Sequence, residues 1–551
     1  MKYASVTLPE RTVIVRQGDR SYVYLTTGVQ YSSKDKKSQP KRVLIGKLDE
    51  DGKLIPNKNY MDLFGRYLEL PCNKADYVSF GSYAVTDAIC KENGMKELLS
   101  SVFDEDGMRI LDAALYMVVS ENNRMTHFED YEYNHVLFSE KPCTDTAVGN
   151  LFSRIKPKDI DAFIKAWVKL HLSGRKIYIA YDSTNMNSVA LNLELAEYGH
   201  AKDNADLPQV NVSVAYDQND GRPVFYEMYP GSIIDNTECR KMVERAEHYG
   251  CKGIGFVLDR GYFSLSNIRY FEEHEYAYIL MTKGNAVFIC EAAEECAAVL
   301  KNGYNCFLEE HELYGTTIEK KLFSSSDRKQ YVHVYYDERR AAEERIELNK
   351  RLVMMDRHLE EKKGKKIVRK EELKEYEKYY RLRYDDNGYF LAYQRKEKEV
   401  KKQIDRCGIF AIVTSEEMDA EEALNIYRNR DAVEKIFRMD KSYLGNDVFR
   451  VHNNEKLEGK VFVSFVALII RNAIQNRLRP LYKKNRKEYT VPMALRQYER
   501  LGLTKLSDDK YHLRYALTNK QKALLEIHGI NEKEYEKLAR NEAADLAREC
   551  D

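Results

Sequence analysis

Residues 427–441, YRNRDAVEKIFRMDK, carry several chemically reactive side chains at helical spacing. At about 100° per residue, four of them fall within an arc of roughly 60°, and Arg438 lies beside that arc. These four side chains are Tyr427, Arg430, Glu434 and Lys441. The side chains that point away from the arc are apolar: Ala432, Val433, Ile436, Phe437 and Met439. The stretch therefore predicts one amphipathic helix with a buried apolar face and an exposed polar one.

A single carboxylate among cations and a phenol suits a phosphate that is bound through a metal ion. The carboxylate would hold a divalent cation, and the cations would hold phosphate oxygens. The alternative is a solvated helix face with ion pairs between residues four apart. The stretch by itself leaves both interpretations open.

Two aspartates add to this set, because each follows an apolar strand. KIYIAYD ends in Asp182, and GIGFVLD ends in Asp259. Strands this apolar are typical of a sheet that is covered on both faces, so the pattern predicts two carboxylates at neighbouring strand ends. Aspartate is also common where a strand turns into a loop. The combination with Glu434 favours a functional site.

The composition limits the class of protein. Lys and Arg together number 88, as do Asp and Glu, so the net charge is zero and a purely electrostatic nucleic-acid coat protein is disfavoured. Local basic patches can still bind DNA. Ten cysteines without a CxxC pair, and no signal peptide, predict reduced thiols in the cytosol. The longest apolar run, 461–470, predicts a buried helix, because ten residues cannot span a bilayer.

Strand and helix patterns divide the chain into six parts. Asp259 and Glu434 are 175 residues apart. A helix, a strand and a final helix need only about 35–45 residues, which predicts an insertion between them. The expected parts are a β unit at 1–60, a helical region and candidate for DNA binding at 61–172, the first part of an α/β core at 173–283, an insertion at 284–406, the completion of the core at 407–455 and a helical C-terminal region at 456–551.

Three motifs resemble those of bacterial insertion-sequence DDE transposases with the YREK signature. They are YDSTN with Asp182, VLDRGYFS with Asp259, and the spacing Y-x2-R-x3-E-x6-K from Tyr427 to Lys441. The segment PGSIIDNTE at 230–238 is also similar to that family. The resemblance implies an α/β fold, mixed α+β overall, whose ribonuclease H-like core is interrupted by a β-rich insertion.

The resemblance also implies the chemistry, which is metal-dependent cleavage and joining of DNA. The implied catalytic and metal-binding triad is Asp182, Asp259 and Glu434. Two Mg²⁺ ions about 4 Å apart, which Mn²⁺ can replace, would activate a water or a DNA 3′-hydroxyl and stabilise the leaving oxygen. The implied DNA-binding side chains are Tyr427, Arg430 and Lys441, with Arg438 beside them. The implied partners are the inverted-repeat ends and the target DNA, which a homodimer binds in the bacterial cytosol at the nucleoid.

The insertion departs from the family because it has no Trp. Family members that cut through a DNA hairpin are expected to stack a flipped base on such a side chain. The aromatic residues that could replace it also fit core packing, and they are Tyr304, Phe307, Tyr314 and Phe323.

A basic cluster after the apolar run is a further candidate for contact with the DNA backbone, or else a solvated helix end. It comprises Arg471, Arg477, Arg479, Lys483, Lys484, Arg486 and Lys487.

Two rival functions remain. A ribonuclease H-fold nuclease that never joins strands would use the same carboxylates, but it needs neither the YREK face nor the insertion. A domesticated, inactive DNA-binding protein would not need the complete triad.

Overall fold

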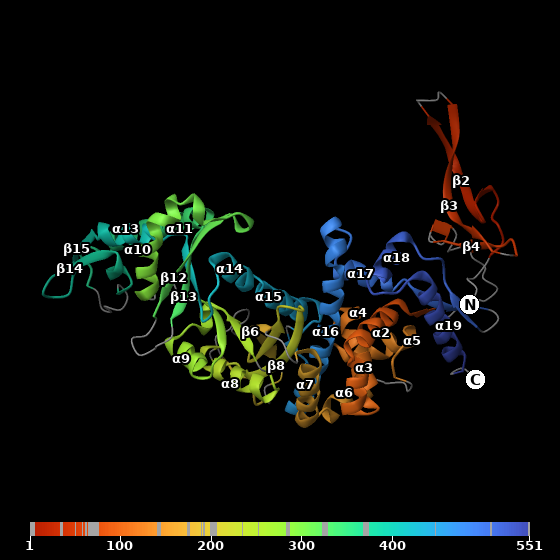
Figure 1. Ribbon diagram of the computed structural model, residues 1–551, viewed down its shortest axis with the longest axis horizontal. Coiled ribbons are helices and arrows are strands. Elements are labelled where there is room, and N and C mark those ends of the chain that lie inside the picture. The colour runs from red at the N-terminus through yellow and green to blue at the C-terminus, as the bar shows by residue number, and fades with distance from the viewer. Residues whose placement is uncertain are drawn as a thin grey trace.

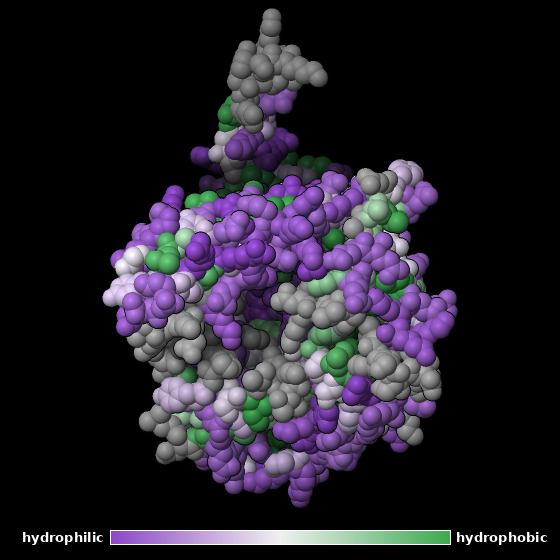
Figure 2. Space-filling view, turned by 90° about the vertical axis from the view of Figure 1, so that its left-hand side faces the viewer, coloured by the Kyte–Doolittle hydropathy of each residue, from purple (hydrophilic) through white to green (hydrophobic). Residues whose placement is uncertain are grey.

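The computed structural model describes residues 6–548 apart from 33–36, 50, 58, 61–62, 64–76, 140–144, 173–176, 189, 191–192, 199–206, 234, 252, 283–286, 322–328, 367–373, 447 and 507–509. The molecule is elongated, with a lobe at one end, a large sheet and a group of helices in the middle, and an N-terminal hairpin that projects at the other end (Figure 1). The side that the lobe presents is mainly hydrophilic and is hollowed near its centre (Figure 2).

A ten-stranded mixed sheet forms the centre of the molecule. Its strands are β6 (Ile177–Ser188), β7 (Gln209–Asp217), β8 (Arg222–Pro230), β9 (Ile254–Leu258), β10 (Ala277–Met281), β11 (Phe307–Leu308), β12 (Leu313–Lys320), β13 (Gln330–Tyr336), β16 (Ile409–Thr414) and β17 (Val448–Phe449). Their order is β11-β12-β13-β16-β10-β9-β6-β7-β8, and β17 pairs with β6. β6, β7 and β8 are antiparallel neighbours, whereas β9 and β10 run parallel to β6. These five strands lie in the part of the chain where the resemblance implies a ribonuclease H-like core.

Helices cover both faces of this sheet, which explains why its central strands are apolar throughout. Along β9, Phe256 and Leu258 contribute to the main core, and Val257 contributes to a second core with α14. Successive side chains of a strand point to opposite faces, so both faces of β9 are buried. The helices that contact the strands of the sheet include α9 (Leu265–Glu273), α10 (Val287–Asn302), α14 (Ala420–Arg428) and α15 (Asp431–Arg438), and α8 (Asp235–His248) precedes β9 in the chain.

The region between Asp259 and α14 contributes to two structures. β12 and β13 extend the central sheet, because β13 pairs with every residue of β16. That pairing satisfies backbone N–H and C=O groups that an isolated hairpin would expose. The later part forms the lobe, with a small core of its own. Its elements are α11 (Glu338–Lys362), β14 (Tyr380–Tyr384), β15 (Phe390–Arg395) and α13 (Glu397–Asp405).

The long helix α16 (Asn454–Lys484) joins the sheet to the helices of the N-terminal region. All ten residues of the apolar run at 461–470 are buried in it, as predicted for a buried helix. α16 packs against β8, α4 (Asp106–Ser120) and α6 (Asp145–Arg154). Other helices of this region are α2 (Gly81–Asn93), α3 (Met95–Phe103), α5 (Phe128–Asn134) and α7 (Pro157–Leu172).

The two ends of the chain carry smaller sheets. The N-terminal one runs in the order β1 (Thr12–Gln17), β2 (Arg20–Ser32), β3 (Lys37–Leu48), β4 (Leu54–Pro56). The other joins distant segments, because β18 pairs with both β5 and β19. Its strands and the adjoining helices are β5 (Tyr77–Ser79), α17 (Val491–Tyr498), β18 (Gly502–Lys505), β19 (Tyr511–Leu513), α18 (Asn519–Glu526) and α19 (Glu532–Arg548).

The mixed α/β fold expected from the sequence is confirmed by this arrangement. Within the described ranges, none of the helices is both long enough and apolar enough to cross a bilayer.

Gly459 allows α16 to lie directly against α6. A Cβ at this position would come 2.1 Å from the carbonyl oxygen of Phe152 and 2.8 Å from its Cα, and these are backbone atoms that no rotamer change can move. We expect Gly459→Ala to lower the free energy of unfolding by about 1–3 kcal/mol, because the two helix backbones must separate. Urea unfolding of the purified variant measures this change.

Gly149→Ala is the matched control, because Gly149 lies in α6 and an added Cβ there would meet nothing within 4 Å. The higher helix propensity of alanine should raise its free energy of unfolding by up to about 1 kcal/mol. Equal gains from both substitutions would show that α16 and α6 do not approach each other so closely.

Candidate active site

Asp182 and Asp259 lie beside each other on neighbouring strands. β6 and β9 pair in parallel as far as Tyr181 and Leu258, and each aspartate is the next residue of its strand or loop. The prediction that Asp182 ends its strand is wrong, because β6 continues to Ser188. It continues because β7 still pairs with it where β9 has already ended. The shared register with β9 nevertheless brings both carboxylates to one edge.

The stretch Tyr427–Lys441 is not one helix, as the spacing predicted, but three segments. α14 ends two residues before Arg430, α15 begins just after it, and a π-helical turn follows at Met439–Tyr443. Gln218, just after β7, explains the break. Its amide, in the orientation that satisfies both groups, donates to the Ile426 carbonyl and accepts from the backbone N–H of Arg430. A side chain that takes up backbone groups in this way interrupts the helical ladder.

Arg430 links the helix carboxylate to the sheet carboxylate. Its Nη1 donates to Asp182 Oδ2 at 3.1 Å, and its Nη2 donates to Glu434 Oε1 at 2.9 Å. Burial alone would lower the pKa of this guanidinium, but Tyr427, Asp259, Asp182 and Glu434 together raise it. Arg430 therefore stays charged and draws the carboxylates toward one point.

The predicted exposed face is in fact divided between buried and exposed side chains. The Arg430 side chain is only 7% exposed, and Tyr427 is also buried, whereas the Glu434 side chain is 58% exposed. The reason is that α15 packs against β6, so the polar arc meets the edge of the sheet where the aspartates lie. The expectation that Arg430 is a surface residue is wrong.

Tyr427 joins the third carboxylate to the same group. Its hydroxyl donates to Asp259 Oδ1 at 3.2 Å, and the Arg430 guanidinium lies 5.6 Å from the centre of its ring. Burial and the neighbouring Asp259 raise the pKa of the Tyr427 phenol, and Arg430 opposes them. At neutral pH Tyr427 is therefore a neutral hydrogen-bond donor. Asp259 Oδ1 also accepts from the backbone N–H of Arg260 at 2.7 Å.

The donor set at this point fits a divalent cation. Two carboxylates contact the Arg430 guanidinium and the third is joined to it through Tyr427, so three acidic groups stand against one cation. Hard carboxylate oxygens with excess negative charge are ligands that Mg²⁺ and Mn²⁺ prefer. In the described part of the chain, no group of three or more His, Cys, Asp or Glu side chains lies close enough together to hold a metal ion as it stands. Here the Arg430 guanidinium lies between Asp182 and Glu434, and an ion would have to replace one of its contacts.

The remaining predicted DNA-binding cations lie further along the same segment. Arg438 is exposed near the end of α15, and Lys441 is partly buried in the π-helical turn. Asp440 lies between them in the sequence and is buried. Its Oδ1 accepts a hydrogen bond from the Asn446 amide at 2.6 Å. Burial raises the pKa of Asp440 to about 6, against the opposing effects of Asn446 and Lys441.

The aromatic residues proposed to replace a Trp differ in their surroundings. Tyr304 is 90% exposed and Phe307 is 43% exposed, so neither is a core residue. Tyr314 is partly buried and packs edge-on against Phe307, with ring centres 5.4 Å apart. Phe323 lies outside the described residues.

The predicted basic cluster is divided in the same way. Arg471 pairs with Glu121 at 2.7 Å, and Arg477 pairs with Glu92, so both arginines connect α16 to the N-terminal helices. The members that are exposed near the end of α16 are Arg479, Lys483, Lys484, Arg486 and Lys487.

We expect Arg430→Ala to lower the free energy of unfolding by roughly 3 kcal/mol, because it leaves the largely buried Asp182 carboxylate without its cation. Arg438→Ala is the matched control on the same helix and should change stability by less than about 0.5 kcal/mol, since Arg438 is exposed. Chemical unfolding of both variants gives the comparison. Equal losses of unfolding free energy in the two variants would mean that the buried ion pair of Arg430 does not stabilise the fold more than an exposed arginine does.

Asp440 predicts a pH dependence of stability. Its pKa is about 6 in the folded protein and about 3.9 in an unfolded chain. The folded state therefore binds its proton more tightly, and this stabilisation is present at low pH and lost as pH rises through about 6. Asp440→Asn removes that loss, so the stability of the variant relative to wild type should rise by about 1 kcal/mol between about pH 5 and pH 7.5. A constant difference across this range, measured by urea unfolding, would contradict the assignment.

Comparison with known proteins connects this geometry to a family. A family model described as the transposase DDE domain matches residues 174–470, which include Asp182, Asp259 and Glu434. Among solved structures, the piggyBac transposase in a cryo-EM synaptic complex with hairpin DNA is similar at 10% identity and a TM-score of 0.33, over 85% of this chain and 74% of that one. A likeness this loose says nothing about the activity of this chain. No curated protein matches the sequence. Because the family model spans more than half of the 551 residues, the chain belongs to the family of transposases with a DDE domain.

Proposed function

We propose that this chain is the transposase of a bacterial insertion sequence with the YREK signature, and that it cuts and joins DNA at the ends of that element. The meeting of Asp182, Asp259 and Glu434 around Arg430 and Tyr427 is the observation that supports this most strongly. Three carboxylates from two strand positions and one helix are what metal-assisted phosphoryl transfer requires at a single point. The Y-x2-R-x3-E-x6-K spacing supports the choice of family.

Asp182, Asp259 and Glu434 would hold two divalent cations, Mg²⁺ or Mn²⁺. When bound, these ions supply an activated attacking oxygen and charge stabilisation at the leaving oxygen. One oxygen of each aspartate already accepts from the following backbone N–H, at 2.8 Å for Asp182 and 2.7 Å for Asp259. Those hydrogen bonds fix the orientation of both carboxylates, and the second oxygen of each is therefore held in one direction.

Arg430 would exchange a carboxylate partner for a DNA phosphate. A guanidinium can give two parallel hydrogen bonds to a phosphate. The buried Nε of Arg430 has no hydrogen-bond partner among the described residues, which supports such a spare contact. Lys441 and Arg438 would add charge further along the DNA strand.

Tyr427 is suited to binding and not to attack. Burial keeps its phenol neutral, and its hydroxyl donates a hydrogen bond to Asp259. A neutral phenol that is already a donor is a weak nucleophile. The attacking group would therefore be a water for cleavage and a DNA 3′-hydroxyl for joining, without a covalent link between protein and DNA.

The family resemblance carries the other parts of the proposal. The substrates would be the inverted-repeat ends of the element and a target DNA, bound by a homodimer at the nucleoid of a bacterial cell. Tyr304 and Phe307, which are exposed, would be available to stack an unpaired base if cleavage passes through a hairpin.

We expect Asp182→Asn to bind the element's end DNA as wild type does, but to lose Mg²⁺-dependent nicking and strand joining by at least about a hundredfold. Asparagine keeps the shape of the side chain and loses the charge that holds a hard cation. Labelled end DNA measures both properties, binding by gel shift and cleavage and joining by product length. Asp386→Asn, the same change at an exposed turn of the lobe, is the control and should be fully active.

The result separates the candidate functions. Wild-type cleavage rates in Asp182→Asn would remove Asp182 from the metal site. A wild-type protein that cuts but never joins DNA would be a nuclease, and one that binds without either reaction would be the domesticated alternative.

A further inference from the structure

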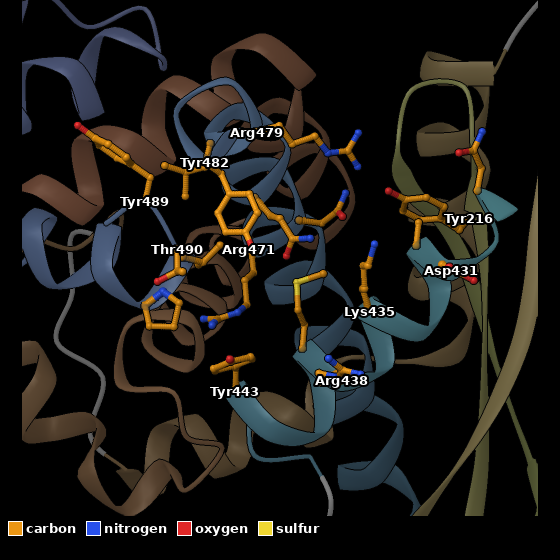
Figure 3. Close-up of a pocket in the computed structure, with 18 of the residues that line it drawn as sticks. Tyr216, Asp431, Lys435, Arg438, Tyr443, Arg471, Arg479, Tyr482, Tyr489 and Thr490 are labelled. Atoms are coloured by element: carbon orange, nitrogen blue, oxygen red, sulfur yellow. The ribbon is translucent and has the colours of Figure 1, made fainter. Parts of the chain in front are cut away.

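A cavity of about 610 Å³ lies beside the carboxylate site, on a different flank of α15. Most of its lining residues come from α15, the π-helical turn, α16 and the segment that leads into α17 (Figure 3). Glu434 faces the carboxylate site, while the next residue, Lys435, lines the cavity, because successive helical side chains point about 100° apart. The cavity is therefore a neighbour of the catalytic carboxylates and not part of them.

The cavity is strongly cationic. Five Arg or Lys side chains and only one acidic side chain, Asp431, line it. Lys435, Arg438 and Arg479 are exposed, and none of them has an ion pair with any residue that the structure describes. Lys435 projects from α15 into the space that faces Arg479 on α16 (Figure 3). Unpaired cations that face each other across a cavity suit an anionic ligand.

The base of the cavity contains a partly satisfied arginine. Arg471 is only 1% exposed and pairs with Glu121, and its guanidinium lies 4.4 Å from the centre of the Tyr443 ring. Its buried Nε has no hydrogen-bond partner among the described residues. Burial lowers the pKa of this guanidinium, which means that its charge is incompletely compensated. A further anionic or polar group in the cavity would correct that deficit.

Tyrosine rings supply a second kind of contact. Tyr482 on α16 is 41% exposed, and Tyr489 is partly exposed on the segment before α17. Both line the cavity next to its cations. Aromatic rings combined with a positively charged groove are typical of sites for single-stranded nucleic acid, since every base can stack on a ring.

We propose that this cavity binds an unpaired nucleotide of single-stranded DNA, with its phosphate between Lys435 and Arg479 and its base against Tyr482 or Tyr489. The volume is in the range of about 300–1,000 Å³ that small ligands occupy, so it admits a nucleotide and excludes a duplex. The choice of DNA as the ligand rests on the proposed function. The position next to α15 would hold a displaced strand close to the carboxylates without using them.

The test is fluorescence anisotropy with a labelled single strand of about ten thymidines and with a hairpin duplex of similar length, in EDTA so that metal-dependent cleavage cannot contribute. Wild type should bind the single strand at least about tenfold more tightly than the duplex.

Lys435→Gln combined with Arg479→Gln should weaken single-strand binding at least about tenfold. The same double variant should reduce the slope of log affinity against log salt by about 0.7 for each phosphate that it no longer neutralises. Tyr482→Leu should weaken binding roughly fivefold or more and leave the salt slope unchanged.

Two control pairs keep the result specific. Arg357→Gln with Lys401→Gln removes the same two charges from exposed positions of the lobe and should leave binding unchanged. Lys484→Gln with Lys487→Gln removes two exposed charges near the end of α16 that do not line the cavity. An equal loss in this second pair would overturn the proposal in favour of a diffuse cationic surface. Equal binding of duplex and single strand, or unchanged binding in the cavity variants, would also overturn it.

The outcome is independent of the test of the proposed function. Failure of the cavity variants to change single-strand binding leaves the loss of nicking in Asp182→Asn as it stands. Failure of Asp182→Asn to lose nicking leaves the metal-free binding comparison intact.

Discussion

The buried guanidinium of Arg430 constrains the arrangement of everything around it. Its side chain is 7% exposed, so water cannot compensate its charge, and Asp182 and Glu434 must do so. Asp182 belongs to β6 and Glu434 to α15, so the two ionic contacts of Arg430 link the helix to the strand. The same side chain lies beside Tyr427, which holds Asp259. Three carboxylates are thus linked, two directly and one through Tyr427, to a residue that carries the opposite charge.

The position of Arg430 depends in turn on a chain of contacts that reaches α16. Asn472 and Asn476 of α16 both donate to the carbonyl of Gly221, in the turn between β7 and β8. Gln218 stands in the same turn and bridges the junction between α14 and α15. The turn is therefore held by α16 on one side, and on the other side it contacts the break between α14 and α15 at Arg430. Loss of packing at α16 would be transmitted to the carboxylates through these hydrogen bonds.

The sequence predicted the carboxylates better than their surroundings. The positions of Asp182 and Asp259 could be predicted because each follows a strand that is apolar throughout. The parallel register of β6 and β9 then places the two side chains next to each other. The burial of Arg430 could not be found, because helical periodicity gives the direction of a side chain but not what lies opposite it. The contact of Gln218 with the junction between α14 and α15 could not be predicted either, since a polar residue in QNDGR is typical of an ordinary turn. The strands β12 and β13 were visible locally, but their pairing through β16 joins residues far apart in sequence, which no local pattern encodes.

We propose that Asp182, Asp259 and Glu434 form one site for divalent cations, with Arg430 as the counter-charge when no ion is bound. The most direct measurement is an anomalous-difference map from crystals of the full chain grown with Mn²⁺. The account predicts Mn²⁺ within about 2.3 Å of oxygens from at least two of these carboxylates, and a movement of the Arg430 guanidinium away from one of them. Crystals saturated with Mn²⁺ in which Arg430 still bridges Asp182 and Glu434, and no ion contacts any of the three carboxylates, would contradict it.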